Sequence, residues 1–265
     1  MSRTSPGRRG SAADAVSALG RREHLVVLDA DDTLWHVEPL YDDARAQARG
    51  IAEAAGLDGA EWESLERRLD VANVATFGLS PKRFPTSCVQ AYREMAGAPD
   101  SLVESRIWSA AFAVFARPAP LAPDAGTAMK KFRSVARVAL LTKGDENVQR
   151  TRLASSGLAN CFDGVWIVEE KNRRAFQKVL THFSCRPDRA WSVGNSLRSD
   201  IVPALEIGMN AIWIDAHVWE YERAESEIHA AAGYPRAHSL IEAANMISAH
   251  ILRGAPQTAA DSGSP

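Results

Sequence analysis

The sequence predicts an α/β fold in which a parallel β-sheet carries helices on both faces and a separate helical insert. Two observations lead to this prediction. Short apolar runs alternate with helix-like segments from residue 124 to residue 214, which is the rhythm of a parallel sheet with crossover helices. Residues 41–115 lack that rhythm, because their segments have a helix-like composition and none resembles a strand.

The composition is that of a folded protein with a sizeable core. The 265 residues are 46% hydrophobic, which suits one large domain or a core domain with an insertion. A net charge of −2 disfavours nucleic acid and acidic membranes as partners, and no apolar stretch approaches the roughly 18 residues of a membrane span. The three cysteines have no zinc-ligand spacing, so we expect free thiols and a cytoplasmic location.

The first strand is the apolar run 25–28, and carboxylates crowd its carboxyl end. Asp29, Asp31 and Asp32 lie within four residues of one another. Clustered carboxylates repel one another and are costly to desolvate, so this cluster indicates a bound cation. Open α/β sheets bind their ligands at the carboxyl ends of the strands, so we expect the chemistry of the protein here.

The helical insert follows directly after this strand. Its helix-like segments are 41–55, 60–74, 84–96 and 100–115, separated by breaks that contain glycine or proline. Such an insert is most simply a lid above the carboxyl end of the first strand. The proline-rich run 117–123 then returns the chain to the core.

The other strands come in the second half of the chain and complete a Rossmann-like parallel sheet. We expect them at 135–141, 164–168, 190–193 and 211–214, with helices at 124–133, 146–156, 173–183 and from about 197 to 206. The predicted domain boundaries are a disordered leader 1–22, an α/β core of 23–36 and 117–253, a helical cap 37–116 and a disordered tail 254–265.

Four strand ends carry distinctive residues. In chain order they are Asp29-Ala30-Asp31-Asp32-Thr33, Thr142, Lys171 and Gly194-Asn195-Ser196-Leu197-Arg198-Ser199-Asp200. Because the carboxyl ends of parallel strands face one way, these residues can converge. In order and context they resemble the four motifs of the haloacid dehalogenase-like (HAD) hydrolases. The resemblance covers residues 25–215, and four motifs in order on matching elements are a specific signal.

The resemblance implies a phosphatase that acts on a small phosphorylated metabolite with Mg²⁺ as its cofactor. Asp29 would form an aspartyl-phosphate, and Asp31 would protonate the leaving alcohol and then activate water. Asp31 must then hold a proton at the first step, and the neighbouring acids favour this. Members of the family that cleave carbon–halogen bonds lack an acid at this position, so Asp31 favours phosphoryl chemistry.

The resemblance also assigns the charge-stabilising groups. Thr142 and Lys171 would hold the oxygens of the transferring phosphoryl group. The metal ligands would be Asp29, the backbone carbonyl of Asp31, Asn195 and Asp200, since Mg²⁺ is a hard cation that prefers oxygen.

Two of these assignments have alternatives. Lys178 or Lys143 could take the place of Lys171, whose charged neighbours also fit a solvated loop. Asn195 stands where the family often has Asp, which leaves open whether Asn195 or Asp200 contacts the metal. An amide oxygen can coordinate Mg²⁺ but carries no charge.

Further residues are candidates for substrate contact. Thr33, Lys143 and Gly144 adjoin the motifs, although Lys143 also fits a solvent-facing position at the rim of the cleft. In the cap, Lys82 and Arg83 belong to a loop with two aromatic residues, and either cation could reach the distal part of a substrate. A solvated lid loop is the alternative for both.

Two other functions stay open on the sequence alone. A phosphotransferase or mutase would use the same residues, and a catalytically weak binding protein that kept the fold would explain Asn195. In each case we expect a small phosphorylated metabolite as the ligand, no nucleic-acid or membrane partner, and a monomer or homodimer. The sequence does not show whether Trp219, Tyr221 or the loop at His217 reaches the cleft.

Overall fold

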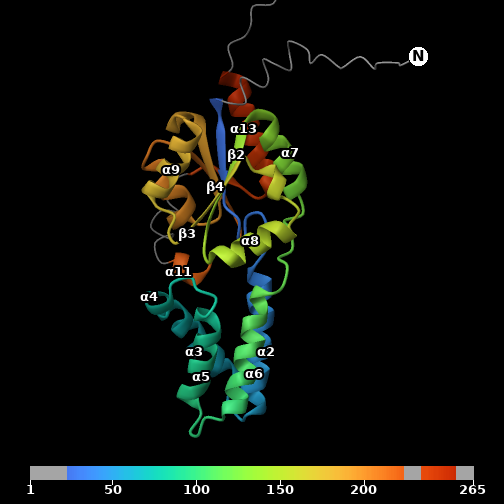
Figure 1. The fold of residues 1–265 in the computed structure, drawn as a ribbon, viewed down its shortest axis with the longest axis vertical. Coiled ribbons are helices and arrows are strands. Elements are labelled where there is room, and N and C mark those ends of the chain that lie inside the picture. The colour runs from blue at the N-terminus through green and yellow to red at the C-terminus, as the bar shows by residue number, and fades with distance from the viewer. Residues whose placement is uncertain (1–22, 224–233, 255–265) are drawn as a thin grey trace, which may run out of the picture.

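The computed structural model describes residues 23–223 and 234–254, and its centre is a parallel sheet (Figure 1). The six strands lie in the order β3-β2-β1-β4-β5-β6, and every neighbouring pair is parallel. They are β1 (Leu25–Leu28), β2 (Arg137–Lys143), β3 (Gly164–Val168), β4 (Ala190–Gly194), β5 (Asn210–Ile214) and β6 (Arg236–Ala237). The predicted α/β fold is confirmed. The predicted leader lies outside the described residues, as does the predicted tail beyond residue 254.

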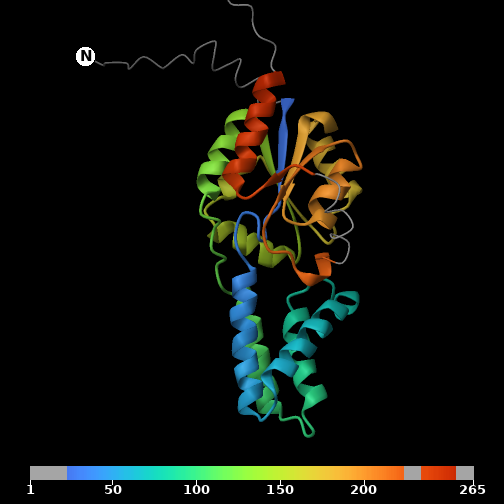
Figure 2. The same cartoon turned by 180° about the vertical axis from the view of Figure 1, so that it is seen from behind.

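Helices cover both faces of the sheet (Figures 1 and 2). These helices are α7 (Ala125–Val135), α9 (Arg173–Phe183), α10 (Val202–Leu205) and α13 (Leu240–Gly254). Two further helices, α8 (Glu146–Ser155) and α11 (Glu220–Arg223), lie at the end of the sheet nearest the cap (Figure 1). On β1, Val26 and Leu28 share an apolar cluster with α7 and α13, whereas Leu25 and Val27 share one with α9. Successive side chains of a strand point to opposite faces, so a strand covered on both faces is apolar throughout.

The cap is a second unit, and it adjoins the carboxyl ends of the strands (Figures 1 and 2). Its elements are α2 (Glu38–Ala54), α3 (Gly59–Ala72), α4 (Val74–Phe77), α5 (Arg83–Met95), α6 (Ser101–Phe112) and the 3₁₀ turn Ala113–Phe115. Trp62 and Ile107 are fully buried in an apolar cluster whose buried members all belong to these elements. The all-helical cap of the predicted fold is present.

The differences from the predicted elements occur at their ends and in short elements. β2 covers 137–143 instead of 135–141, because Thr142 and Lys143 pair with β3 and extend the strand. Thr142 is therefore a strand residue and not the loop residue that we expected. The predicted helix after β4 begins with a π-helical segment, Leu197–Ile201. Within residues 23–223 and 234–254, none of the helices has both the length and the apolar character needed to span a bilayer.

Candidate active site

The end of β1 forms the floor of the site. Asp29 is the first residue after the strand, it is buried, and its backbone N–H donates to the Val193 carbonyl on β4 at 2.9 Å. Asp32 has a φ of +55°, a region that Asp tolerates better than most residues. Its carboxylate accepts the backbone N–H groups of Val37 (2.9 Å) and Glu38 (3.3 Å) at the start of α2. Asp32 therefore holds the junction between core and cap, as a loop hydrogen-bonding residue would.

Three charged side chains from different strand ends meet in the site, namely Asp29, Lys171 and Asp200. Lys171, which follows β3, forms ion pairs with Asp29 and, at 2.5 Å, with Asp200. The side chains are 4% exposed for Lys171, 7% for Asp29 and 3% for Asp200. Two acids thus share one base in a buried place. We call these three residues the acidic trio.

Burial and the uneven charge of the trio change its pKa values. Burial, followed by the charge of Asp200, raises the pKa of Asp29 to about 7, although Lys171 opposes the shift. Burial alone would lower the pKa of Lys171, but Asp200 and Asp29 more than offset this and hold it above its usual value. Lys171 therefore stays charged, and an additional cation would favour the ionised form of Asp29.

The loop after β4 is shaped for the close approach of Asp200. A Cβ at Gly194 would lie 2.3 Å from the carboxyl carbon of Asp200, so a side chain at this position would displace the carboxylate. The second oxygen of Asp200 accepts the backbone N–H of Ser196 at 2.9 Å. Asn195 is buried beside them, and its Oδ1 accepts a long bond of 3.4 Å from the Thr33 hydroxyl.

These oxygen atoms fit a hard divalent cation. Asp29 and Asp200 offer carboxylates to the same ammonium group, and the amide oxygen of Asn195 is only weakly engaged. In the part of the chain that the structure describes, no group of three or more His, Cys, Asp or Glu residues could hold a metal by itself. An ion here would therefore combine two carboxylates with amide or backbone oxygens, a ligand set that Mg²⁺ accepts.

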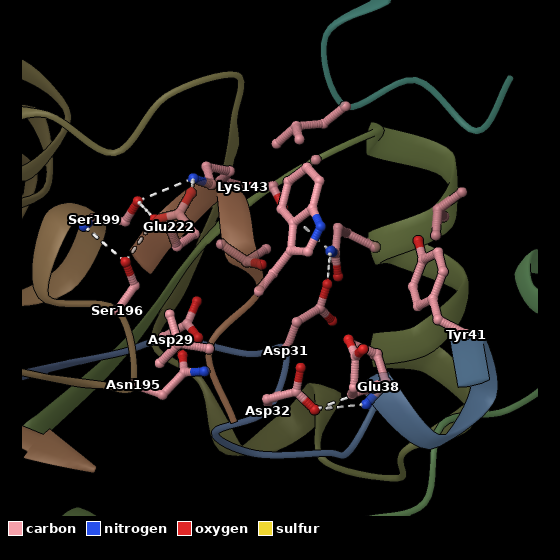
Figure 3. A pocket seen from close by; sticks show the side chains of 18 of the residues that line it. Asp29, Asp31, Asp32, Glu38, Tyr41, Lys143, Asn195, Ser196, Ser199 and Glu222 are labelled. Carbon is pink, nitrogen blue, oxygen red and sulfur yellow. Dashed lines mark hydrogen bonds and ion pairs between the residues drawn. The ribbon is translucent and has the colours of Figure 1, made fainter. Parts of the chain in front are cut away.

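Asp31 lies next to Asp29 at the cavity (Figure 3). Its Oδ1 accepts the indole N–H of Trp35 at 2.7 Å, and its Oδ2 accepts from Gln149 at 2.8 Å and Arg152 at 2.9 Å. The neighbouring acids visible in the sequence are therefore not the main surroundings of this carboxyl group, because three donors contact it. Gln149 and Arg152 were not predicted. They lie three residues apart on α8, so their shared helix face was the available signal.

Glu222 lies on the other side of the cavity from Tyr41 and contacts the segment after β4 and the end of β2 (Figure 3). It accepts the hydroxyls of Ser196 (2.6 Å) and Ser199 (2.8 Å) and forms an ion pair with Lys143. Burial raises the pKa of Glu222, but the charge of Lys143 and these hydrogen bonds outweigh burial and lower it. Lys143 lines the cavity, and its charge is taken up by Glu222.

A cavity of about 160 Å³ lies between the core and the cap. The predicted site residues that line it are Asp29, Asp31, Arg83, Thr142, Lys143, Gly144, Lys171, Asn195 and Asp200. Thr33 and Lys82 lie elsewhere, since Thr33 is buried beneath Asn195 and Lys82 is exposed on the cap. Trp219, which the sequence left open, also lines the cavity.

Known proteins provide an independent comparison with this site. A family profile described as haloacid dehalogenase-like hydrolase matches residues 24–208, which include all four motifs. The chain belongs to the haloacid dehalogenase-like hydrolases. The resemblance inferred from the motifs is confirmed.

Relatives of this HAD hydrolase include phosphatases that match over most of its length. Phosphoserine phosphatase of Thermus thermophilus is 32% identical over 226 residues, covering 72% of this chain and 88% of that protein. N-acylneuraminate-9-phosphatase of Mus musculus is 25% identical over 215 residues, covering 73% and 83%. The crystal structure of a HAD-like family hydrolase from Xanthomonas campestris has a TM-score of 0.69 and 26% identity, covering 88% of this chain and 100% of that one. This HAD hydrolase is an enzyme that acts on phosphoric monoesters.

Proposed function

We propose that this HAD hydrolase is a Mg²⁺-dependent phosphatase that hydrolyses a small phosphorylated metabolite through an aspartyl-phosphate on Asp29. The observation that supports this most strongly is the acidic trio. Its nucleophile candidate is a buried carboxylate with its pKa raised to about 7, at the floor of a cavity lined by core and cap. Such a group is shielded from bulk water and close to a fixed ammonium charge.

In the first step, an oxygen of Asp29 attacks the phosphorus, and the bond between phosphorus and the alcohol oxygen breaks. The Lys171 ammonium and the Thr142 hydroxyl orient the phosphoryl oxygens and offset their charge. Asp31 gives its proton to the leaving oxygen, and its contact with Arg152 then stabilises the carboxylate that remains. The alcohol leaves, and the phosphoryl group stays on Asp29.

In the second step, Asp31 takes a proton from a water molecule, which attacks the phosphorus of the aspartyl-phosphate. The bond between phosphorus and the Asp29 oxygen breaks, so inorganic phosphate leaves and Asp29 is restored. Asp31 ends the cycle with the proton that it needs for the next substrate. Each residue therefore returns to its starting state.

The metal would be held by Asp29, Asp200, the Asn195 amide oxygen and the backbone carbonyl of Asp31. When bound, Mg²⁺ supplies positive charge that lets an anionic carboxylate approach an anionic phosphate. The trio with both acids ionised has a charge of −1, from two acids and one base, and a divalent cation changes it to +1. A net positive site favours a dianionic phosphate ester.

The size of the cavity favours a small substrate. The volume of about 160 Å³ is below the roughly 300–1,000 Å³ of pockets that hold drug-sized ligands, so the cavity suits a small metabolite. The relative from Thermus thermophilus is named for a small phosphorylated amino acid, which also supports a metabolite as substrate.

The test is phosphate release by the purified chain from an aryl phosphate and from a panel of metabolite phosphates. We expect turnover that requires Mg²⁺, stops with a chelator and is lost in Asp29→Asn. Asp188→Asn is the matched control, because Asp188 is an exposed acid of the core that pairs with Arg186. A protein without Mg²⁺-dependent turnover on any member of the panel would contradict the proposal.

A further inference from the structure

Arg83 begins α5, and its guanidinium is buried between the cap and the core, with its side chain 8% exposed. Nη1 donates to the Asp70 carboxylate and, at 3.1 Å, to the Asp70 carbonyl on α3. The Cζ atom lies 4.3 Å from the ring centroid of Trp219, which belongs to the core. Asp70 and Trp219 therefore fix the guanidinium at one end and on one face.

The opposite edge of this guanidinium has no occupant within residues 23–223 and 234–254. Nε is buried, and no described residue accepts a hydrogen bond from it. In arginine the N–H of Nε runs parallel to one N–H of Nη2, and together they form a two-pronged donor. A buried donor of a charged group is costly without an acceptor. Arg83 lines the same cavity as Asp29, so a ligand bound at Asp29 can supply that acceptor.

The charges around this edge favour a singly charged anion. Burial raises the pKa of the Tyr41 hydroxyl, while the positive charges of Arg152 and then Arg83 oppose the shift, so both guanidinium groups act at this end of the cavity. Each is partly neutralised, since Arg83 pairs with Asp70 and Arg152 pairs with Asp31. The two guanidinium groups and the two carboxylates sum to no net charge, so the attraction is local to the unpaired edge of Arg83 and suits a carboxylate better than a second dianionic phosphate.

We propose that Arg83 binds a carboxylate of the substrate through Nε and Nη2, while the phosphate of the same molecule lies at Asp29. Two parallel N–H groups match the two oxygens of a planar carboxylate, whereas a hydroxyl engages one of them and an ammonium is repelled. The inference rests on the proposed phosphatase function and adds a substrate class to it. That class is small phosphorylated hydroxy or amino acids.

The test uses pairs of phosphate esters that differ at the carboxylate. O-phosphoserine is compared with O-phosphoethanolamine, and 3-phosphoglycerate with glycerol 3-phosphate. We expect the wild-type enzyme to prefer the acid in at least one pair by at least about tenfold in kcat/KM, mainly through a lower KM. Arg83→Lys keeps a positive charge beside Asp70 but lacks the two-pronged edge. In this variant the KM of the ester with the carboxylate should rise and the KM of the ester without it should stay unchanged, so the preference is lost.

Arg93→Lys is the matched control, because Arg93 lies on the same helix and pairs with Glu104 at 2.6 Å on the exposed surface of the cap. It should leave the kinetics of both pairs unchanged. Equal kcat/KM values within both pairs for the wild-type enzyme would overturn the carboxylate site. An Arg83→Lys enzyme whose kcat/KM falls equally for both esters of each pair would overturn it as well. The wild-type comparison stays decisive if Arg83→Lys folds poorly.

A failure of the proposed function gives a different result, namely no hydrolysis of any ester with Mg²⁺. The carboxylate site is then tested by calorimetric binding of the same four esters to Asp29→Asn, which cannot form the aspartyl-phosphate. Tighter binding of the acid in at least one pair supports the site. Equal affinities within both pairs overturn it.

Discussion

The core and the cap both bury ionic groups, but only the cap balances their charge. At the strand ends, Asp29 and Asp200 share the single base Lys171. In the cap, Arg45 of α2 pairs with Glu66 of α3 at 2.8 Å, and Arg83 pairs with Asp70, so each buried acid has a base of its own. Both sets of groups are almost fully buried.

The difference separates a group of buried charges that lacks a counterion from ion pairs that join the helices of the cap. A buried ion pair is stable only when each charge is matched, because burying a charge alone is costly. The cap pairs meet this condition and join neighbouring helices. The core trio does not meet it, because two carboxylates share a single ammonium group. The unmatched charge therefore marks the place where a cation and an anionic substrate are expected.

The largest effect that we expect from a change in the core is on activity. Asp29→Asn removes the proposed nucleophile, so kcat should fall by at least about 10⁴-fold. The thermal midpoint of unfolding should stay the same or rise, because Asp200 and Lys171 then form a balanced pair. Phosphate release and a thermal melt of the same preparation check both halves. A clear loss of stability in this variant would show that Asp29 stabilises the core as the paired acids stabilise the cap, which would contradict the comparison.

In the cap, the corresponding change should act on stability. Arg45→Met leaves Glu66 buried without its base, so the free energy of unfolding should fall by about 3–5 kcal/mol. Urea denaturation measures this change. Adding Glu66→Leu to that variant removes the stranded acid and should restore most of the loss. A double variant that is no more stable than the single one would show that Arg45 acts through packing instead.

The pH dependence of stability tests how strongly burial acts on Glu66 in the cap. Burial, together with the charge of Asp70 and against that of Arg45, raises the pKa of Glu66 from 4.5 to about 7. Between these values the folded protein holds a proton that the unfolded chain has released. The stability contributed by this group is therefore full below pH 4.5 and is lost as the pH rises toward 7, by about 3 kcal/mol in total.

Glu66→Gln isolates this contribution from those of other buried acids. From pH 4.5 to pH 8, the variant should become more stable relative to the wild type by up to about 3 kcal/mol in the free energy of unfolding. Above pH 8 this difference should no longer change with pH. Urea titrations at several pH values measure the difference. A difference that does not change with pH would place the pKa of Glu66 near its ordinary value.

The parallel sheet could be predicted because its strands leave a strong local signal. A strand buried on both faces is apolar throughout, and 25–28 shows such a run within the bounds that the structure gives. The half-buried edge strand 164–168 is also apolar and also has the predicted bounds. The convergence of Asp29, Lys171 and Asp200 follows from the same reasoning, since all three lie at or just beyond the carboxyl ends of parallel strands. β6 has two residues and α11 has four, which is too short for any periodic signal.

The partners of the site residues could not be predicted, because they depend on tertiary contacts. Arg152 meets Asp31 across 121 positions of sequence, and although it shares a helix face with Gln149, nothing in the sequence indicates that this face meets Asp31. Glu222 meets Lys143 across 79 positions. The sequence motifs single out the groups that we propose do the chemistry, whereas the groups that hold them are set by how distant segments pack.

The smallest effect that we expect is on metal affinity, and it distinguishes the two candidate ligands after β4. Asp200→Ala removes a buried negative charge from the trio, whereas Asn195→Ala removes a neutral amide. Charge dominates the binding of a hard cation, so Asp200→Ala should raise the Mg²⁺ concentration for half-maximal activity by at least about tenfold more than Asn195→Ala does. A Mg²⁺ titration of phosphate release measures this order, and the thermal shift produced by Mg²⁺ gives it without turnover.

The conservative variant Asp200→Asn refines the result, because it keeps an amide oxygen at the position and removes only the charge. If it behaves like Asp200→Ala, the charge of Asp200 holds the ion. If Asn195→Ala weakens Mg²⁺ more than either, the ion binds through the amide instead. Asp200 then serves chiefly to hold Lys171, with which it forms an ion pair at 2.5 Å. In that case the unmatched charge of the trio positions the ammonium for the phosphate and does not bind the metal.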